Sequence, residues 1–265
     1  MNYLVPPILL TLLCGLSVGI GAFVALFIPK THGRTICLGL AFSAGIMLWL
    51  GLSPLFHEHH PAGSFYADGH FPPAPATFGE QPFIWFLAGV LLTGALEFFL
   101  CRKKPSDEQT SPSGQPMRHT GEFSALAIAA HGFPECLAIF GVALMEPLAG
   151  LILCAAIMAH HFPLGLSIAL PFKQQGSSCR RPIAYALLAG LLPATAAILL
   201  CLLVQPIFSH ASLGLLFPLA GGIMTCIAVT KLMPSARSYG SWQTLLTGWM
   251  AGLLFASLLL QFHRH

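Results

Sequence analysis

Residues 123–144 have the sequence FSALAIAAHGFPECLAIFGVAL, which is mostly apolar but is interrupted at mid-length by His131 and Glu135. The next apolar stretch, LAGLILCAAIMAHHFPLGLSIALP at 148–171, begins after three intervening residues and has the same character. A helix needs about 20 mostly apolar residues to cross the hydrocarbon core of a bilayer. Both stretches are long enough, so we expect two transmembrane helices joined by a short turn.

The whole chain shares this apolar composition. Charged residues make up 8% of its 265 residues and the mean hydropathy is +0.77, whereas soluble domains average about 25% charged residues. So little polar surface could not coat a globule in water, and the bilayer must be the solvent for most of the chain. The net charge of +3 is too small for a nucleic-acid-binding face. The eight cysteines are scattered singly, and we interpret them as small buried hydrophobic residues.

Eight segments qualify as spanning helices by length and apolarity. They predict an all-α membrane protein in which residues 1–265 form one transmembrane domain. Two longer connections, a His-rich loop at 57–81 and a charged loop at 102–121, are expected to be disordered. The eight segments are 4–29, 35–56, 82–101, 123–144, 148–171, 183–206, 213–234 and 241–262.

The basic residues predict the orientation of these helices, because cytoplasmic loops are enriched in Lys and Arg. With this segmentation, eleven of the twelve Lys and Arg residues fall on one face, and only Arg264 falls on the other. We therefore assign the basic face to the cytoplasm and expect both termini outside. The eleven residues are Lys30, Arg34, Arg102, Lys103, Lys104, Arg118, Lys173, Arg180, Arg181, Lys231 and Arg237.

Similar short motifs recur in helices that must run in opposite directions across the membrane. The sequence SAGIM at 43–47 resembles AGGIM at 220–224, five helices later. In the same way, HGFP at 131–134 resembles HHFP at 160–163 in the next helix. Inverted repeats with proline-interrupted helices are typical of transporters, and a binding site is expected where the repeats meet.

The polar residues of the fourth and fifth segments form a candidate metal site. His131 and Glu135 are four residues apart, so they share one helical face. Counting from the turn at Pro147, these two residues and His160 all lie about 18–24 Å along their helices, in one layer near the bilayer centre. Imidazole nitrogen and carboxylate oxygen suit Zn²⁺, Fe²⁺ or Mn²⁺. A carboxylate at this depth costs about 3 kcal/mol on insertion scales and usually has a function.

Two prolines mark the same layer. Pro134 cannot donate a hydrogen bond to the carbonyl of Ala130, and Pro163 likewise leaves the carbonyl of Ala159 without its helical partner. Free carbonyls at this depth are tolerated only where protein, water or an ion meets them. The alternative is that the histidines are packing residues hydrogen-bonded to neighbouring backbone. That alternative is the better interpretation of either histidine alone, but metal binding better explains the paired motif.

The motifs resemble those of a known family. AHGFPECLA at 130–138 looks like the HNxPEG motif in helix four of the ZIP (Zrt-, Irt-like protein) metal transporters, and HHFPLGLS at 160–167 looks like its second copy in helix five. The repeated AGIM-like runs and LMP at 232–234 resemble the bacterial zinc-uptake branch. The likeness covers nearly the whole chain.

The resemblance implies a fold and a mode of action. It implies eight helices in a 3+2+3 arrangement with inverted repeats, and both termini outside. It also implies elevator-like sliding of helices one, four, five and six against the rest, in a homodimer. The expected location is the plasma membrane, which is the inner membrane if the protein is bacterial.

By resemblance, the family's two-metal site would keep His131, Glu135 and His160, with His161 as a possible fourth ligand. Gly132 stands where the motif has asparagine, and four positions that carry acids in the family carry other residues here. Because the carboxylate that bridges two metals is absent, we expect one bound ion. The four substituted positions are Pro54, Leu164, Pro193 and Lys231.

Two further features have open interpretations. The ammonium group of Lys231 could occupy the charge position of a second cation, or the side chain could be an anchor that reaches the interface. A polar cluster in the loop at 57–81 could collect metal before entry, or it could be simply solvated. The members of that cluster are His57, Glu58, His59, His60 and His70.

The leading functional prediction is a transporter of divalent metal ions, with Zn²⁺, or Fe²⁺, Mn²⁺ or Cd²⁺, as substrate and no cofactor required. A second hypothesis is a membrane protein that keeps the fold but senses metal or binds a partner without transport. A third is an intramembrane zinc hydrolase, since three protein ligands plus an open position is a catalytic arrangement. No separate general base accompanies the ligands, so we do not expect an enzyme.

Overall fold

The computed structural model describes residues 2–27, 33–56, 82–102, 120–174, 176–204 and 210–261, and every regular element within them is a helix. A helix lies at each of the eight segments expected from the sequence, which confirms the all-α prediction. The helices are η1 (Asn2–Leu4), α1 (Val5–Ala25), α2 (Gly33–Phe56), α4 (Pro82–Arg102), α5 (Thr120–Met145), α6 (Pro147–Gln174), α7 (Arg180–Val204), α8 (His210–Ile227), η2 (Ala228–Leu232), α9 (Met233–Tyr239) and α10 (Trp242–Gln261).

The seventh segment differs from the single helix expected over 213–234. It consists of α8, the π-helical turn η2 and α9, and it continues to Tyr239. Pro234 does not end the helix: it is the second residue of α9, which follows the π-helical turn η2 without a break. The π-helical turn just before it holds Lys231.

Six helical stretches are long and apolar enough to cross a membrane. Two shorter apolar stretches lie in α4 and α5, at Pro82–Ala95 and His131–Leu144. Large apolar side chains on the outside of the bundle, such as Leu91 (71% exposed) and Leu203 (78% exposed), suit a surface that contacts lipid tails rather than water. The chain is therefore a multi-pass membrane protein. The six stretches are Val5–Ala25, Gly33–Ser53, Pro147–Leu170, Arg180–Leu203, Phe217–Tyr239 and Trp242–Leu259.

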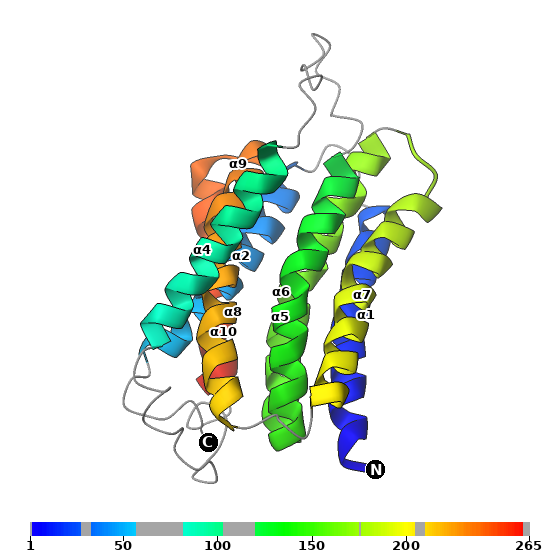
Figure 1. The fold of residues 1–265 in the computed structure, drawn as a ribbon. Coiled ribbons are helices and arrows are strands. Elements are labelled where there is room, and N and C mark those ends of the chain that lie inside the picture. Colours follow the sequence, from blue (N-terminus) through cyan, green and yellow to red (C-terminus); the bar gives the residue numbers. More distant parts are fainter. Residues whose placement is uncertain are drawn as a thin grey trace.

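The helices pack in two groups (Figure 1). In the first group, α1 packs against α5, α6 and α7; in the second, α2 packs against α10 and α8, and α4 packs against α8. The groups meet where α2 contacts α6 and where α5 contacts α8. The start of α1 and the end of α10 lie at the same end of the bundle (Figure 1).

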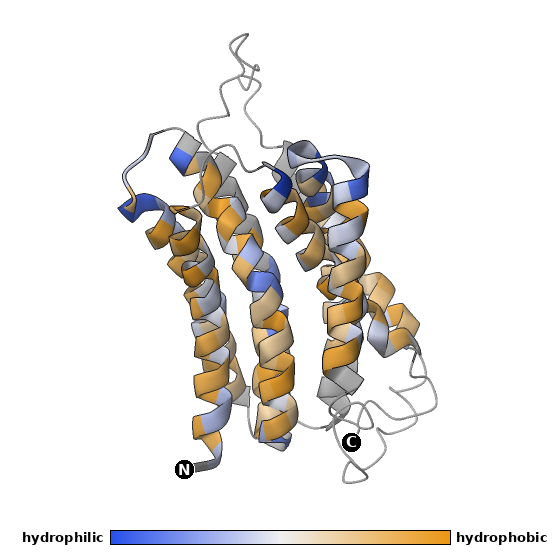
Figure 2. Ribbon diagram, turned by 180° about the vertical axis from the view of Figure 1, so that it is seen from behind, coloured by the Kyte–Doolittle hydropathy of each residue, from blue (hydrophilic) through white to orange (hydrophobic). Residues whose placement is uncertain are grey.

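Hydrophilic residues gather at the opposite end of the bundle (Figure 2). Arg180 begins α7 at this end, and Arg237 lies in α9. Lys173, in the last turn of α6, donates hydrogen bonds to the carbonyls of Leu26 (2.6 Å) and Ala25 (3.2 Å). A cation at this position satisfies carbonyls that the end of α1 leaves without helical partners.

Several sequence predictions concern residues outside the described ranges. They include the whole loop 57–81 with its histidine cluster and most of the charged loop, and the side chain of Pro54 is likewise not described. The basic residues outside these ranges are Lys30, Lys103, Lys104, Arg118 and Arg264.

Glycines let α1 and α6 touch backbone to backbone. A Cβ atom added to Gly165 of α6 would collide with the carbonyl oxygen of Val18 in α1, and one added to Gly21 of α1 would collide with that of Phe162. Small residues permit this close approach, which is how helices gain packing energy where lipid offers no hydrophobic contrast. The two helices therefore form one closely packed unit.

We predict that Gly165→Ala destabilises the protein, because α1 and α6 must separate to admit the methyl group. Overpacking of this kind costs about 1–3 kcal/mol, so the midpoint of thermal unfolding in detergent should fall. The matched control is Gly94→Ala in α4, whose added Cβ has no neighbour within 4 Å. Equal midpoints for the two variants would contradict the packing argument.

Candidate metal centre

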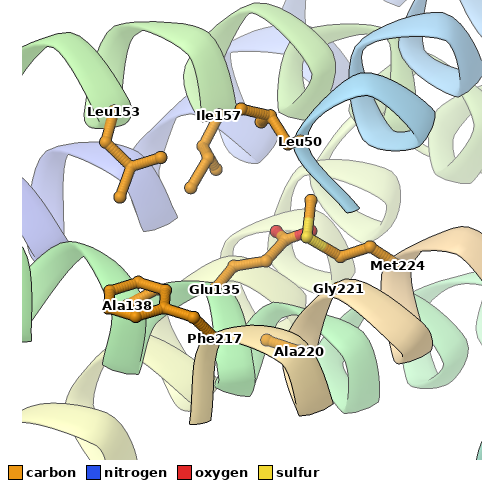
Figure 3. A pocket seen from close by; sticks show the side chains of 9 residues that line it. All are labelled: Leu50, Glu135, Ala138, Leu153, Ile157, Phe217, Ala220, Gly221 and Met224. Carbon is orange, nitrogen blue, oxygen red and sulfur yellow. The ribbon is translucent and has the colours of Figure 1, made fainter. Parts of the chain in front are cut away.

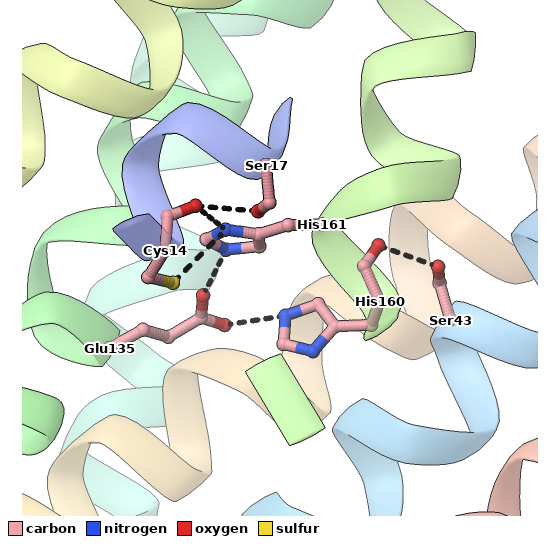
Figure 4. A network of polar contacts seen from close by, with 6 residues as sticks. All are labelled: Cys14, Ser17, Ser43, Glu135, His160 and His161. Carbon is pink, nitrogen blue, oxygen red and sulfur yellow. Dashed lines mark hydrogen bonds and ion pairs between the residues drawn. The ribbon is translucent and has the colours of Figure 1, made fainter. Parts of the chain in front are cut away.

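Four buried polar side chains meet between α5 and α6. His131 and Glu135 come from α5, His160 and His161 come from α6, and each is at most 2% exposed. The Glu135 carboxylate lies between two of the imidazoles (Figure 4). Its Oε2 is 2.7 Å from Nε2 of His161, and its Oε1 is 3.3 Å from Nε2 of His160.

Three of these residues bring their ligand atoms together. One ligand atom each from His131, Glu135 and His161 lie within 4.8 Å of one another. Donors around a tetrahedral Zn²⁺ are about 3.3 Å apart, given bonds of about 2.0–2.1 Å. A modest contraction of this trio would therefore enclose one ion.

The structure brings together all four residues singled out from the sequence. His161 belongs to the converging trio, whereas the sequence analysis placed His160 ahead of it. Neighbouring residues on a helix point about 100° apart, so sequence spacing alone does not suggest that both histidines contact one partner. They do so because the two oxygens of Glu135 each contact a different ring.

The second nitrogen of His161 faces α1. Its Nδ1 lies 3.3 Å from the carbonyl oxygen of Cys14 and 3.4 Å from the Cys14 Sγ, and that carbonyl also accepts a hydrogen bond from the hydroxyl of Ser17. A carbonyl that accepts from one ring nitrogen fixes the ring orientation and directs the other nitrogen toward a metal. Cys14 and Ser17 are thus the supporting residues of the centre, and sequence analysis did not identify them.

Nε2 of His161 lies 2.7 Å from Oε2 of Glu135, which is a hydrogen-bond distance. A metal ion bound by both atoms would take the place of this hydrogen bond.

One hydrogen bond at the centre joins the two helix groups. The hydroxyl of Ser43 in α2 donates to the carbonyl of His160 in α6, at 2.8 Å (Figure 4). Three residues later, Pro163 interrupts the backbone hydrogen bonding of α6. The contact between α2 and α6 therefore includes a polar link at the level of the centre.

A small cavity lies beside Glu135, between the two helix groups (Figure 3). Its volume of about 30 Å³ is enough for a water molecule or an ion. Glu135 is the one ionisable side chain among the described residues that line it. The other lining residues are Leu50, Ala138, Leu153, Ile157, Phe217, Ala220, Gly221 and Met224.

Apolar groups occupy two of the positions where the resemblance predicts acids. Leu164 is 2% exposed, and Pro193 of α7 is buried against α5. A Cβ atom added to Gly132 would lie 3.4 Å from Cγ of Pro193. Lys231 lies on η2, seven residues beyond Met224 and so about 10 Å farther along the helix than the cavity.

Comparison with known proteins gives a consistent result. Residues 101–260 match the family model described as ZIP Zinc transporter. The chain is 33% identical to a protein named Zinc transporter ZupT from Chlorobium phaeovibrioides, over 97% of the chain and 98% of the relative. Proteins of the same name from Chlorobium luteolum (32% identity, 95% of both chains) and Clostridium perfringens (28% identity, 96% of this chain and 94% of the relative) are also similar.

These relatives are named as transporters, and they do not support the intramembrane hydrolase considered above. The matches confirm the resemblance to the bacterial zinc-uptake branch that the motifs in α2, α5, α6 and α8 indicated. The chain therefore belongs to the ZIP zinc transporter family.

Proposed function

We propose that this protein carries Zn²⁺ or a similar divalent ion across the membrane, bound by His131, Glu135 and His161. The observation that supports this most is the burial of the Glu135 carboxylate among imidazoles, with ligand atoms already within 4.8 Å of one another. His160, 3.3 Å from the other carboxylate oxygen, is the fourth candidate ligand. The ion is the substrate, and no resident cofactor is invoked.

We propose further that the site holds one ion. By resemblance, the family's motif has asparagine at the position of Gly132 and acids at the positions of Leu164 and Pro193, and the acid at Leu164 is the carboxylate that bridges two metals. Here Pro193 lies beside Gly132, where an added Cβ atom would be 3.4 Å from its Cγ, and Leu164 is buried. These three residues offer no side-chain ligand, which leaves one carboxylate and the histidines to share a single cation.

The arrangement of the helices suggests how the ion moves. All four candidate ligands lie in the group formed by α1, α5, α6 and α7, which would slide against α2, α4, α8 and α10. The close packing of α1 on α6 supports movement of that group as a unit. The hydrogen bond from Ser43 to the His160 carbonyl would stabilise the position described here, and the cavity beside Glu135 would be part of the entry route.

The proposal includes a membrane topology. All eight helical segments would cross the membrane, with both termini outside and the basic end of the bundle in the cytoplasm. The common position of the start of α1 and the end of α10 (Figure 1) supports an even number of crossings. On the resemblance alone, we extend the proposal to a homodimer in the plasma membrane, which is the inner membrane if the protein is bacterial.

Removal of the carboxylate should stop transport. The assay measures the initial rate of ⁶⁵Zn²⁺ uptake into proteoliposomes. Glu135→Gln should lower this rate at least about tenfold, because mutation even of a residue that only supports a metal site lowers metal affinity or activity about 10–100-fold. Glu146→Gln, at the turn between α5 and α6, is the matched control and should transport normally. Flux through Glu135→Gln and His131→Ala equal to that of the unaltered protein would refute the site. Calorimetric binding without flux would favour the sensor hypothesis.

Each protein chain should bind one ion at this site. Isothermal titration of detergent-purified protein with Zn²⁺ should give a tight component of one ion per chain, which disappears in His161→Ala. Leu153→Ala, a change in the cavity wall that removes no ligand, is the control and should keep this component. Two tight ions per chain, both lost when Glu135 is changed to glutamine, would contradict the single-ion proposal.

Cys179 offers a native probe of topology. It is exposed in the turn before α7, on the face assigned to the cytoplasm. A membrane-impermeant maleimide should therefore label it only after cells are permeabilised, whereas Tyr3→Cys at the start of the chain should react in intact cells. The signal from Cys179 is identified by its loss in Cys179→Ala. Labelling of Cys179 in intact cells would reverse the proposed orientation.

A further inference from the structure

Each helix group is held together by close backbone contacts at glycines. In the first group, a Cβ atom added to Gly190 of α7 would collide with the carbonyl oxygen of Gly15 in α1. In the second group, one added to Gly252 of α10 would collide with the carbonyl oxygen of Phe42 in α2. Small residues allow helix backbones to approach this closely, and we expect helices interlocked in this way to move together.

The contact between the two groups is looser where α2 meets α6. A Cβ atom added to Gly39 of α2 would lie 3.5 Å from Cβ of Pro163 in α6, which is an ordinary van der Waals distance. The small cavity beside Glu135 also lies between the groups. At these points the groups meet without interlocked backbones, so relative movement is easier between the groups than within them.

Ser43 makes a polar contact across this looser interface. It lies one helical turn after Gly39, and its hydroxyl donates to the carbonyl of His160, at 2.8 Å, with both residues completely buried (Figure 4). The hydroxyls of Ser17 and Ser167 instead donate to carbonyls three residues earlier in their own helices, which is a common habit of serine in helices. The hydroxyl of Ser43 therefore links two bodies, whereas those of Ser17 and Ser167 stay within one helix.

We propose that Ser43 is a latch, whose hydrogen bond to the His160 carbonyl holds the two helix groups in the position described here. This inference rests on the proposed function, in which the first group slides against the second and the bond must break for it to do so. A hydrogen bond of this kind changes an equilibrium by about two- to tenfold. The latch thus biases the position of the groups and does not lock it.

The test measures the distance between one spin label in each group, by double electron–electron resonance in detergent. One label is attached to native Cys179, which is exposed in the turn before α7, and the other to Gln243→Cys, at an exposed position in the first turn of α10. In Ser43→Ala, the ratio of the distance populations should shift about two- to tenfold away from the distance that dominates when Ser43 is present. The signal is assigned by its loss in Cys179→Ala. An unchanged distribution in Ser43→Ala would overturn the proposal.

Two control variants test whether the shift belongs to the hydrogen bond. Ser167→Ala removes a hydroxyl that is bonded within α6, and it should leave the distance distribution unchanged. Gly39→Ala adds a methyl group at ordinary contact distance from Pro163 and keeps the Ser43 hydroxyl, so it should also keep the dominant distance. A shift in either control equal to that in Ser43→Ala would mean that the hydroxyl of Ser43 is not a latch.

Transport gives a second readout. Because the described position loses a stabilising bond, the maximal rate of ⁶⁵Zn²⁺ uptake should rise about two- to tenfold in Ser43→Ala and stay unchanged in Ser167→Ala. The distance measurement needs no ion, so it tests the latch even in a protein that carries no metal, and the two proposals can fail separately. A lower rate in Ser43→Ala with an unchanged distance distribution would mean that Ser43 is only a packing residue.

Discussion

The carboxylate of Glu135 imposes the constraint on which the centre depends. A carboxylate buried in the apolar interior of a membrane protein is costly unless polar groups contact it. Here the partners are the rings of His160 and His161, and each contacts a different oxygen of the same carboxylate. This pairing constrains how far α5 and α6 are shifted along each other, because the polar residues of both helices must lie at the same depth in the bundle.

Other contacts within the first helix group hold α1 against α6 at the depth of Glu135. Gly165 and Gly21 allow α1 to approach α6, and this approach brings the carbonyl of Cys14 against His161. Lys173 then joins the end of α6 to the end of α1. Close packing and hydrogen bonding thus hold α1 and α6 together from the centre of the bundle to its basic end.

Sequence analysis predicted the helices well and the details of the centre less well. The eight apolar segments were recognisable because the bilayer demands about 20 apolar residues for each crossing. The π-helical turn η2 and the continuation past Pro234 were not predicted, because both depend on local hydrogen bonding rather than hydropathy. His131 and Glu135 were identifiable from their spacing on one face. The contacts of His161 with Glu135 and Cys14 depend on packing between helices that no single helix encodes.

The lining of the cavity beside Glu135 has a consequence for selectivity. Its walls are mostly aliphatic and aromatic side chains such as Leu50 and Phe217, which cannot replace the water ligands of a hydrated ion. On the route proposed above, an ion would give up part of its hydration shell before it reaches the carboxylate. Mg²⁺ dehydrates reluctantly and prefers to keep several waters, whereas Zn²⁺ accepts four protein ligands readily. On that proposed route the cavity would act as a dehydration filter, which would discriminate by the cost of losing water before any ligand is reached.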